Sequence, residues 1–430
     1  MAAARTKGFC AAFVGGPVWA LDWHPTEAFL AVAAHSLDSP THDFRKRYEE
    51  PVFFQIWAWD EAEGMCTCVA VVHEPRGCVW DLRWDLDAKV TEQSLGMLAV
   101  SFGDASVLVY DIARPKDPKV AAVEVTFLEP LHELPTSPVA GHIWRIKWRP
   151  GRVDAASPRE LLGCSSDGFV TIWRIPEPAA AAAAAAASKE NDDDDGDDDI
   201  PEVKYWANLA HSGCIRSVGW RADGALFSTL GEDRFLRLWR PDAAAYPAWE
   251  TRVTETSTAG NIAWMNASHA GVPMGETMLA VNFEGGVTTA VGNSFGGVAW
   301  DVDVMLRDAD ARQVDVVFCG EDGVLQQCQH KYKKERGSRE GLDFQILSMR
   351  MKDGDGAGDA EEELPPVVLS TEDGMDLGAY KSIRPVHQNL TKVSVWRGGQ
   401  DGVEWAACGS TIGLLLIVPL REENWSQPVL

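Results

Sequence analysis

Three side chains of the types found in hydrolytic triads occur within a short stretch of the chain, His211, Thr229 and Asp233. In such a triad the carboxylate orients the imidazole, and the imidazole takes the proton of the attacking hydroxyl. An indole, Trp239, follows the carboxylate by six residues. Whether the set is catalytic or structural depends on the elements that position it, because side chains act together only where the fold joins them.

Sequence patterns of other common chemistry are missing. The chain has no GxxxxGK[ST] phosphate loop and no HExxH zinc motif, and no GxGxxG opens a helix after a strand. The nine cysteines include no CxxC pair, and no His-rich or Cys-rich segment lies beside Cys66 and Cys68 to complete a metal site. We therefore expect no metal site and no cofactor, and the cysteine usage predicts a reducing compartment.

The strongest signal in the sequence is a recurring pattern with two tryptophans: apolar, Trp, any residue, apolar, any residue, Trp. It begins at Val18, Val79 and Ile143, and a fourth copy at Ile215 has Arg216 in place of the first Trp. Each copy alternates and is rich in β-branched and aromatic residues, which predicts a strand. Self-similarity at intervals of tens of residues predicts a repeat architecture.

A second and a third strand follow each copy and are joined by a tight turn. The second strands are predicted at 29–34, 95–101, 161–165 and 225–229. An aspartate stands in three of the turns, and an aromatic residue six positions later ends the third strand, in the pairs Asp104 and Tyr110, Asp167 and Trp173, and Asp233 and Trp239. A variable fourth strand is predicted at 66–72, 121–127, 203–209 and 249–254.

Four strands per unit with a terminal tryptophan resemble the repeat of the WD40 β-propeller family. Three weaker units follow, starting at Ile262, Val298 and Val393, and the second of them contains the turn residue Asp322. The resemblance implies an all-β, seven-bladed propeller. Residues 9–14 are expected to supply the outer strand of the seventh blade, because pairing the two ends of the chain closes the ring and removes exposed edges.

The same resemblance gives the possible triad a structural meaning. In WD40 repeats, residues of these types form a hydrogen-bonded chain from Trp through Ser or Thr and His to Asp. His211, Thr229, Asp233 and Trp239 match that set in the fourth unit. Such a chain satisfies buried polar groups and locks the blade. We therefore interpret the four residues as structural, and we do not expect the protein to be an enzyme.

The predicted propeller spans residues 1–430 as a single domain with insertions. One insertion, 36–51, separates the second and third strands of blade one. The segment 176–201 contains nine alanines and an aspartate run, and 352–366 is acidic and Gly-rich. Self-repulsion of the acidic runs predicts disordered loops. They are either tolerated surface expansions or attractants for a basic partner tail.

The formal net charge of −25 argues against a protein that grips nucleic acid unaided, because such binding needs a basic surface that displaces counterions. Two basic stretches stand out, 331–336 and Arg45-Lys46-Arg47. Each is a phosphate contact, a nuclear import signal or an ordinary solvated loop. Arg45, Lys46, Arg47 and Tyr48 are the candidate contacts with a partner or phosphate, and Trp425 is a further candidate anchor.

An ordered set of motifs points beyond WD40 repeats in general. It comprises residues 16–23, 29–35, 55–57, 77–84, 95–100, 142–148 and 166–168. Together with the split in blade one, this set resembles the WD-repeat subunit of transcription factor IIIC over about residues 14–240. The resemblance implies a non-catalytic propeller in a multi-subunit factor that recognises internal promoters of transfer-RNA-type genes and recruits RNA polymerase III. Family members often carry a long N-terminal extension, whereas this propeller begins near Met1, so contact with DNA is expected only through partners.

The resulting prediction is a nuclear scaffold whose partners are the other subunits of that complex, with no membrane and no small-molecule substrate. No apolar run reaches the ~20 residues needed to cross a bilayer. A rigid ring presents variable loops on a fixed frame. The alternative is a WD40 adaptor that reads histone or peptide tails in a chromatin or ubiquitin-ligase complex. An acidic face around the central channel would favour this alternative, since basic tails seek carboxylates.

Overall fold

The computed structural model describes most of the chain. The described residues are 4–6, 9–38, 42–43, 45–87, 90–122, 125–136, 141–151, 157–176, 203–243, 245–253, 261–286, 288–291, 298–306, 313–331, 341–351, 367–370, 390–396 and 403–420. All the regular elements among them are β-strands. This part of the chain contains no helix with the length and apolar character needed to span a membrane.

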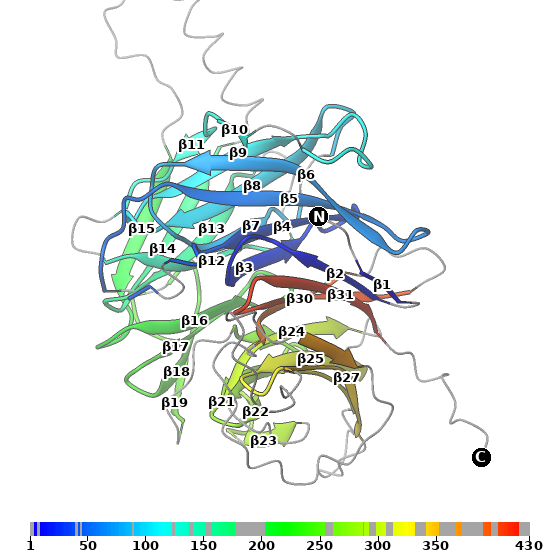
Figure 1. Cartoon of the computed structure of the whole chain (residues 1–430). Helices are drawn as coiled ribbons and strands as arrows, with labels where there is room; N and C mark the ends of the chain where they lie inside the picture. Colours follow the sequence, from blue (N-terminus) through cyan, green and yellow to red (C-terminus); the bar gives the residue numbers. More distant parts are fainter. Residues whose placement is uncertain are drawn as a thin grey trace, which may run out of the picture.

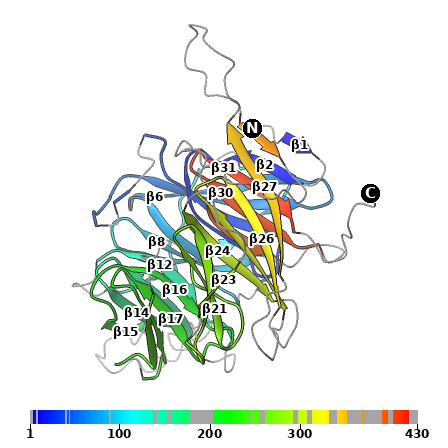
Figure 2. The same ribbon diagram turned by 90° about the horizontal axis from the view of Figure 1, so that it is seen from below.

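The strands form seven sheets arranged as the blades of a ring (Figure 1), and Figure 2 shows the same arrangement from below. The inner strand of each blade contacts the inner strand of the next blade, and the inner strand of the last blade contacts that of the first. The prediction of an all-β, seven-bladed propeller is therefore confirmed.

The first four blades each run from an inner to an outer strand in chain order. Blade one comprises β3 Val18–Trp23, β4 Phe29–Ala34, β5 Val52–Asp60 and β6 Met65–Glu74, with β10 Val125–Thr126 at its outer edge. Blade two comprises β7 Val79–Trp84, β8 Ser94–Phe102, β9 Val107–Ala113 and β11 His132–Glu133. Blade three comprises β12 Ile143–Trp148, β13 Arg159–Ser165, β14 Phe169–Ile175 and β15 Lys204–Leu209. Blade four comprises β16 Ile215–Trp220, β17 Phe227–Gly231, β18 Phe235–Trp239 and β19 Trp249–Arg252.

The remaining blades are less regular. Blade five comprises β20 Ala263–Trp264, β21 His269–Met274, β22 Thr277–Asn282 and β23 Thr288–Val291. Blade six comprises β24 Ala299–Leu306, β25 Gln313–Gly320, β26 Val324–Lys331, β27 Gly341–Met351 and β28 Val367–Ser370. Blade seven comprises β29 Leu390–Trp396, β30 Trp405–Ser410 and β31 Leu414–Pro419, followed by β2 Phe9–Phe13 and β1 Ala4–Thr6 from the other end of the chain.

A β-bulge recurs in the inner strands and accounts for the first tryptophan of the repeated pattern. In β3, β7 and β12 the pairing with the second strand slips by one residue at Trp19, Trp80 and Trp144. The same irregularity occurs in β16, β24 and β29. A bulge bends its strand and re-aims one side chain. The pattern therefore marks the bulge with its first tryptophan and the end of the inner strand with its second.

The outer strand of blade two differs from the prediction. The segment 121–127 was expected to form it, but Val125 and Thr126, the strand residues in its described part, pair in parallel with β6 of blade one. The fourth strand of blade two is instead β11, which pairs with Leu108 and Val109 of β9. The prediction was wrong because a segment of this composition fits the outer edge of either neighbouring sheet, and only the connecting loop decides between them.

The two ends of the chain meet in blade seven, as predicted. β2 pairs antiparallel with β31, with Cys10 opposite Ile417 and Phe13 opposite Leu414. The dark blue and red strands accordingly lie side by side in both views (Figure 1; Figure 2). Cys10 is fully buried, and its Sγ atom lies 3.1 Å from Sγ of Cys66 in blade one. The closing strand thus pairs within blade seven and also contacts blade one.

We propose that the seven sheets form a single domain over residues 1–430, because the strand that closes the ring comes from the beginning of the chain. The acidic segments predicted as insertions, 176–201 and 352–366, lie outside the described residues except for Pro176. They fall between β14 and β15 and between β27 and β28. Both positions connect neighbouring strands of one blade.

Deletion of residues 1–15 is expected to lower the melting temperature by about 5 °C or more and to cause aggregation, because it exposes the edge of β31 and removes buried Cys10 and Val14. Differential scanning calorimetry and light scattering measure the two effects. Deletion of residues 1–3 removes none of the described strands and is the control. An unchanged melting curve for the longer deletion would contradict this closure.

Candidate functional site

The structure brings the four residues of the possible triad together in blade four. The Trp239 indole Nε1–H donates to Thr229 Oγ1 at 2.8 Å. The hydroxyl lies 2.7 Å from His211 Nε2, and His211 Nδ1 lies 2.8 Å from Asp233 Oδ1. A neutral imidazole protonated on Nδ1 satisfies both of these contacts, because it accepts from the hydroxyl and donates to the carboxylate. The order of the chain is therefore Trp, Thr, His, Asp.

The environment of these groups does not suit a nucleophile. The Thr229 side chain is fully buried, so no substrate reaches its oxygen. Burial lowers the pKa of His211 and keeps the ring neutral. Burial alone would raise the pKa of Asp233, but hydrogen bonds from His211 and Arg237 outweigh it, and the pKa lies below the ordinary value. The arrangement fixes a blade and offers no attacking oxygen to solvent.

Blades two and three lack the hydroxyl of this chain, and blade two also has Tyr110 in place of the tryptophan. In blade four, Thr229 lies two residues after the strand residue that pairs with the terminal aromatic residue. The residues at the corresponding positions are Gly163 in blade three and Val100 in blade two. In blade three a Cβ on Gly163 would lie 2.6 Å from the Trp173 ring. The Trp173 indole N–H donates instead to the Pro135 carbonyl at 2.7 Å.

The predicted turn aspartates lie at the hairpin turns. Asp104 Oδ1 accepts from Ser106 N at 2.9 Å, and Asp322 Oδ1 accepts from Val324 N at 3.0 Å. Asp167 Oδ1 accepts from the Ser165 hydroxyl at 2.5 Å. These are local bonds within one turn, and they shape the hairpins of blades two, six and three.

Charged side chains that the sequence analysis did not single out line the central channel. Four are carboxylates and four are cations: Asp22, Asp81, Asp301, Asp303, Arg83, Arg145, Lys147 and Lys392. All come from inner strands, and their charges act on one another across the ring. The channel is therefore lined by equal numbers of opposite charges among the described residues.

Channel side chains form ion pairs both between neighbouring blades and within one strand. Arg83 Nη1 lies 2.9 Å from Asp22 Oδ1, and Arg83 Nη2 lies 3.1 Å from Asp81 Oδ1. Burial raises the pKa of Asp22 and of Asp303. Burial also lowers the pKa of Lys392 to about 8, which leaves this residue mainly protonated at neutral pH. These pKa shifts arise because burial disfavours the charged form of each side chain. Pairing with opposite charges offsets this penalty.

At each of the seven interfaces at least one hydrogen bond joins the two inner edges. In order around the ring, the bonds are Trp84 N to Asp22 Oδ2 (2.9 Å), Ile146 N to Asp81 Oδ2 (3.1 Å), Trp220 Nε1 to Lys147 O (3.1 Å), Trp264 Nε1 to Gly219 O (3.1 Å), Asn261 N to Asp301 Oδ1 (3.1 Å), Val393 N to Asp301 Oδ2 (3.2 Å) and Trp23 N to Ser394 Oγ (3.3 Å). We call this set the inner ring. The second tryptophan of the repeated pattern supplies its indole to the inner ring in blade four, and Trp264 does the same in blade five.

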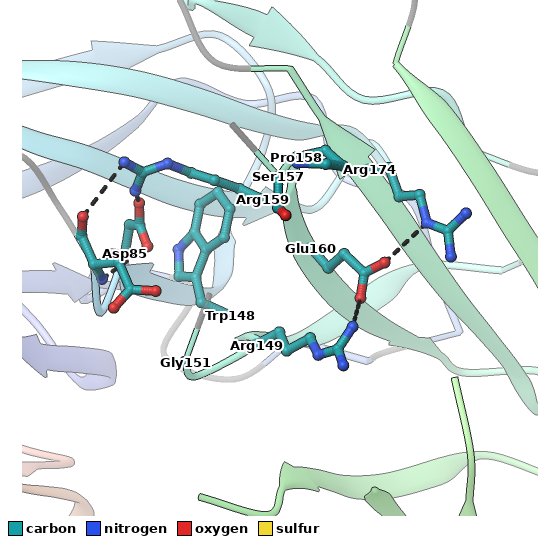
Figure 3. Close-up of a pocket in the computed structure, with 10 residues that line it drawn as sticks. Asp85, Trp148, Arg149, Gly151, Ser157, Pro158, Arg159, Glu160 and Arg174 are labelled. Carbon is teal, nitrogen blue, oxygen red and sulfur yellow. Dashed lines mark hydrogen bonds and ion pairs between the residues drawn. The ribbon is translucent and has the colours of Figure 1, made fainter. Parts of the chain in front are cut away.

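Two cavities accompany these charged groups. One, of about 340 Å³, opens at the end of the channel and is lined by Asp22, Arg83, Lys147 and Asp303 among others. The second, of about 270 Å³, lies between blades two and three (Figure 3). There Arg159 pairs with Asp85, and Glu160 bridges Arg149 at 2.5 Å and Arg174 at 2.8 Å. Both cavities contain ion pairs between their charged groups, an arrangement typical of structural sites.

The insertion of blade one crosses one face of the ring. We call this the insertion face; it carries residues 35–38, 42–43 and 45–50 and the turns at Asp104, Asp167 and Asp233. Tyr48 N donates to Gly103 O of blade two at 3.0 Å. Arg45 Nη2 lies 3.9 Å from Glu232 Oε2 of blade four. The insertion therefore reaches from blade one over blade two to blade four.

The candidate contact residues on this insertion differ in exposure. Arg45, Lys46 and Arg47 are exposed, and the Arg45 side chain is 70% exposed. Tyr48 is half-buried instead, with its ring 4.4 Å from His42 and 6.3 Å from Trp80, and its hydroxyl accepts from Asp43 N at 2.7 Å. The three cations are presented to solvent, whereas Tyr48 anchors the loop.

Some sequence candidates lie outside the described residues. They include Trp425 and all of the second basic stretch except Lys331. Residues 292–296 have the GxSxG pattern of a nucleophile elbow and also lie outside. The elements on either side of this pentapeptide are β23 and β24, outer and inner strands of successive blades, whereas an elbow joins a strand to a helix.

Comparisons with known proteins agree with this architecture. The family model "WD domain, G-beta repeat" matches residues 205–240, which run from the outer strand of blade three to Trp239 and contain the whole hydrogen-bonded chain. A chain in a crystal structure of the mitotic checkpoint complex aligns over 96% of this chain and 94% of its own length, with a TM-score of 0.54 and 12% identity. That likeness shows the fold alone.

Two curated relatives are named "General transcription factor 3C polypeptide 2", from Pongo abelii and from Homo sapiens. Each is 22% identical over 264 residues, which cover 53% of this chain and 27% of the relative. The chain thus matches about a quarter of the length of these relatives. The resemblance to a WD40 subunit of transcription factor IIIC is confirmed as a distant similarity over about half of the chain.

Replacing Thr229 with Val is expected to lower the free energy of unfolding by about 1–3 kcal/mol, because it leaves the Trp239 N–H and a buried His211 nitrogen without their partner. Urea titration followed by tryptophan fluorescence measures the change. Thr171→Val is the matched control, since the Thr171 hydroxyl is buried in blade three without a hydrogen-bond partner. Equal effects of the two substitutions would contradict the role assigned to the chain.

Asp81→Ala is expected to lower the free energy of unfolding by about 3–5 kcal/mol, because it leaves Ile146 N unpaired and removes a carboxylate from buried Arg83. Asp81→Asn keeps an acceptor for Ile146 N, so its stability is expected to lie between those of Asp81→Ala and the wild type. Asp242→Ala, at an exposed loop position, serves as the control. Chemical denaturation gives the three values, and a loss below about 1 kcal/mol for Asp81→Ala would count against the inner ring.

Proposed function

We propose that this chain is a non-catalytic, nuclear scaffold subunit of a transcription factor IIIC complex, where it supports recognition of internal promoters of tRNA-type genes and transcription by RNA polymerase III. The observation that carries the proposal is the distant similarity to general transcription factor 3C polypeptide 2 on a seven-bladed propeller. The geometry of the polar groups supports the scaffold role independently.

The polar interior favours a scaffold over an enzyme. The triad-like set of blade four has a fully buried hydroxyl, and both cavities contain ion pairs between their charged groups. An active site needs groups that reach a substrate at hydrogen-bond distance. The interior groups of this propeller are committed to holding blades together, so the exposed loops are the parts that can contact partners.

The insertion face is the surface that we assign to partner binding. Its three adjacent cations project from a loop that is tied to blades two and four, so they are held over a rigid frame. Because the whole chain carries a net charge of −25, this cluster is a local exception. An acidic surface of another subunit fits it, since opposite charges steer association and fix orientation. DNA is then reached through those subunits.

The alternative function, an adaptor that reads basic tails, finds less support. An adaptor of this kind needs an acidic surface around the channel, where a lysine-rich tail would bind. Among the described residues the four channel carboxylates are matched by four cations. A lysine that entered this channel would meet arginine and lysine as often as aspartate.

The test is co-purification of the epitope-tagged chain from its native cells, followed by quantitative mass spectrometry and recovery of tRNA-gene DNA. We expect the other transcription factor IIIC subunits with the wild type. The triple variant Arg45→Glu, Lys46→Glu, Arg47→Glu is expected to lower their recovery about tenfold, which corresponds to about 1.4 kcal/mol of binding energy.

The matched control reverses three exposed cations on loops of the opposite face: Lys116→Glu, Lys119→Glu and Arg240→Glu. It has the same net charge as the first variant and is expected to retain the subunits. Recovery of cullin adaptors or histones without transcription factor IIIC subunits would overturn the proposed function. Equal losses in both variants would overturn the assignment of the insertion face.

A further inference from the structure

Two histidines and a cysteine from three separate segments meet beneath the insertion face. His35 immediately follows β4 of blade one, His42 lies in the insertion, and Cys78 immediately precedes β7 of blade two. One donor atom from each residue lies within 4.8 Å of the other two. The Nδ1 atoms of the two histidines are only 2.8 Å apart. This cluster lies apart from both cavities and from the blade-four chain.

The hydrogen bonds orient one imidazole for metal binding. His35 Nε2 lies 3.1 Å from the Val79 carbonyl, so Nε2 carries the proton and Nδ1 carries a lone pair. That lone pair faces His42 Nδ1 and the Cys78 thiol. A backbone carbonyl that accepts from the far nitrogen is the usual support of a metal-bound histidine.

The surroundings of the cluster are aromatic. The Trp19 ring stacks on His35 with centroids 5.2 Å apart, and the Tyr48 ring lies edge-on to His42 at 4.4 Å. Trp80 approaches both histidines, at 6.1 and 6.2 Å. His35 and Cys78 are 2% and 4% exposed. A water-poor shell of this kind strengthens the interaction between a cation and its ligands.

We propose that His35, His42 and Cys78 bind one zinc ion, which fastens the insertion of blade one to blade two. Two neutral imidazoles and a thiolate are donors that Zn²⁺ takes in four-coordinate sites, and the fourth position is left for water. Zinc–nitrogen and zinc–sulfur bonds of ordinary length place two nitrogens about 3.3 Å apart and a nitrogen and a sulfur about 3.6 Å apart. The two Nδ1 atoms reach this spacing by separating by about 0.5 Å.

The charges and protons balance at such a site. Binding requires the Cys78 thiol to lose its proton, and the His42 ring to present Nδ1 as a lone pair with its proton on Nε2. One proton is released to solvent for each zinc bound. The bound unit then carries one net positive charge, and the carboxylate of Glu50, which acts electrostatically on both His42 and Cys78, lies near enough to oppose it.

This inference goes beyond the scaffold function and does not depend on it. A bond from the insertion to blade two would hold the loop that carries Arg45, Lys46 and Arg47, which also contacts blade two through the Tyr48 N–H and blade four through the ion pair of Arg45. The sequence gives no CxxC or HxxxH spacing for the site, because its three ligands come from a strand end, a loop and the entry to another blade.

The test measures metal in the full chain, purified without chelators and with an affinity tag free of histidines. Inductively coupled plasma mass spectrometry is expected to find about one zinc per chain in the wild type and less than about a fifth of that in Cys78→Ser and His42→Ala. Addition of Co²⁺ to metal-free protein is expected to produce a thiolate-to-cobalt charge-transfer band that Cys78→Ser abolishes. Zinc is expected to raise the melting temperature of metal-free protein by about 2 °C or more.

Two matched controls occupy the equivalent position of other blades. Cys214 and His142 are buried and immediately precede β16 and β12, as Cys78 precedes β7. Cys214→Ser and His142→Ala are expected to retain zinc. His42→Ala keeps the result interpretable if Cys78→Ser fails to fold, because His42 lies in the insertion. Absence of zinc from the wild type after reconstitution, copper in its place, or equal zinc content in all variants would overturn the proposal.

Discussion

The unpaired inner edges of the seven sheets impose the main constraint on this molecule. Each inner strand has a neighbouring strand on one side only, so half of its peptide groups face the central channel. A buried peptide group without a partner is costly, and a bare edge invites pairing with other chains. The inner ring satisfies part of this requirement, because at each interface a side chain of one blade pairs with the backbone of its neighbour.

The charge pattern of the channel follows from that solution. Carboxylates are strong acceptors for backbone N–H groups, and Asp22, Asp81 and Asp301 serve in this way. Several buried carboxylates close together would repel one another and shift to the neutral form, which donates and no longer only accepts. Arg83, Arg145, Lys147 and Lys392 supply the compensating charges. The same network therefore satisfies the edges and neutralises the channel.

The sequence predicts the blades better than it predicts what joins them. The repeated Val-Trp and Ile-Trp strands, the turn aspartates and the members of the blade-four chain follow from local spacing, because a hairpin brings together residues a few positions apart. Asp81 and Ile146 are 65 residues apart, and no local pattern marks them as partners. The outer strand of blade two was placed wrongly for the same reason, since 121–127 has no local preference between two adjacent edges. His35, His42 and Cys78 meet only after blades one and two are docked.

The inner ring also explains why the blades differ so much in their outer parts. Only blade four among blades two to four has the complete chain from Trp239 to Asp233, yet blades two and three keep their places, because the bonds that order the blades lie at the inner edge. Outer edges are then free to accept β10 on blade one, β28 on blade six and the N-terminal strands on blade seven. Variation on the insertion face has the same freedom, since a loop that spans blades one, two and four rests on strands already fixed from within. A rigid centre with a variable surface is the arrangement that a scaffold needs, because partner contacts can diverge without loss of the ring.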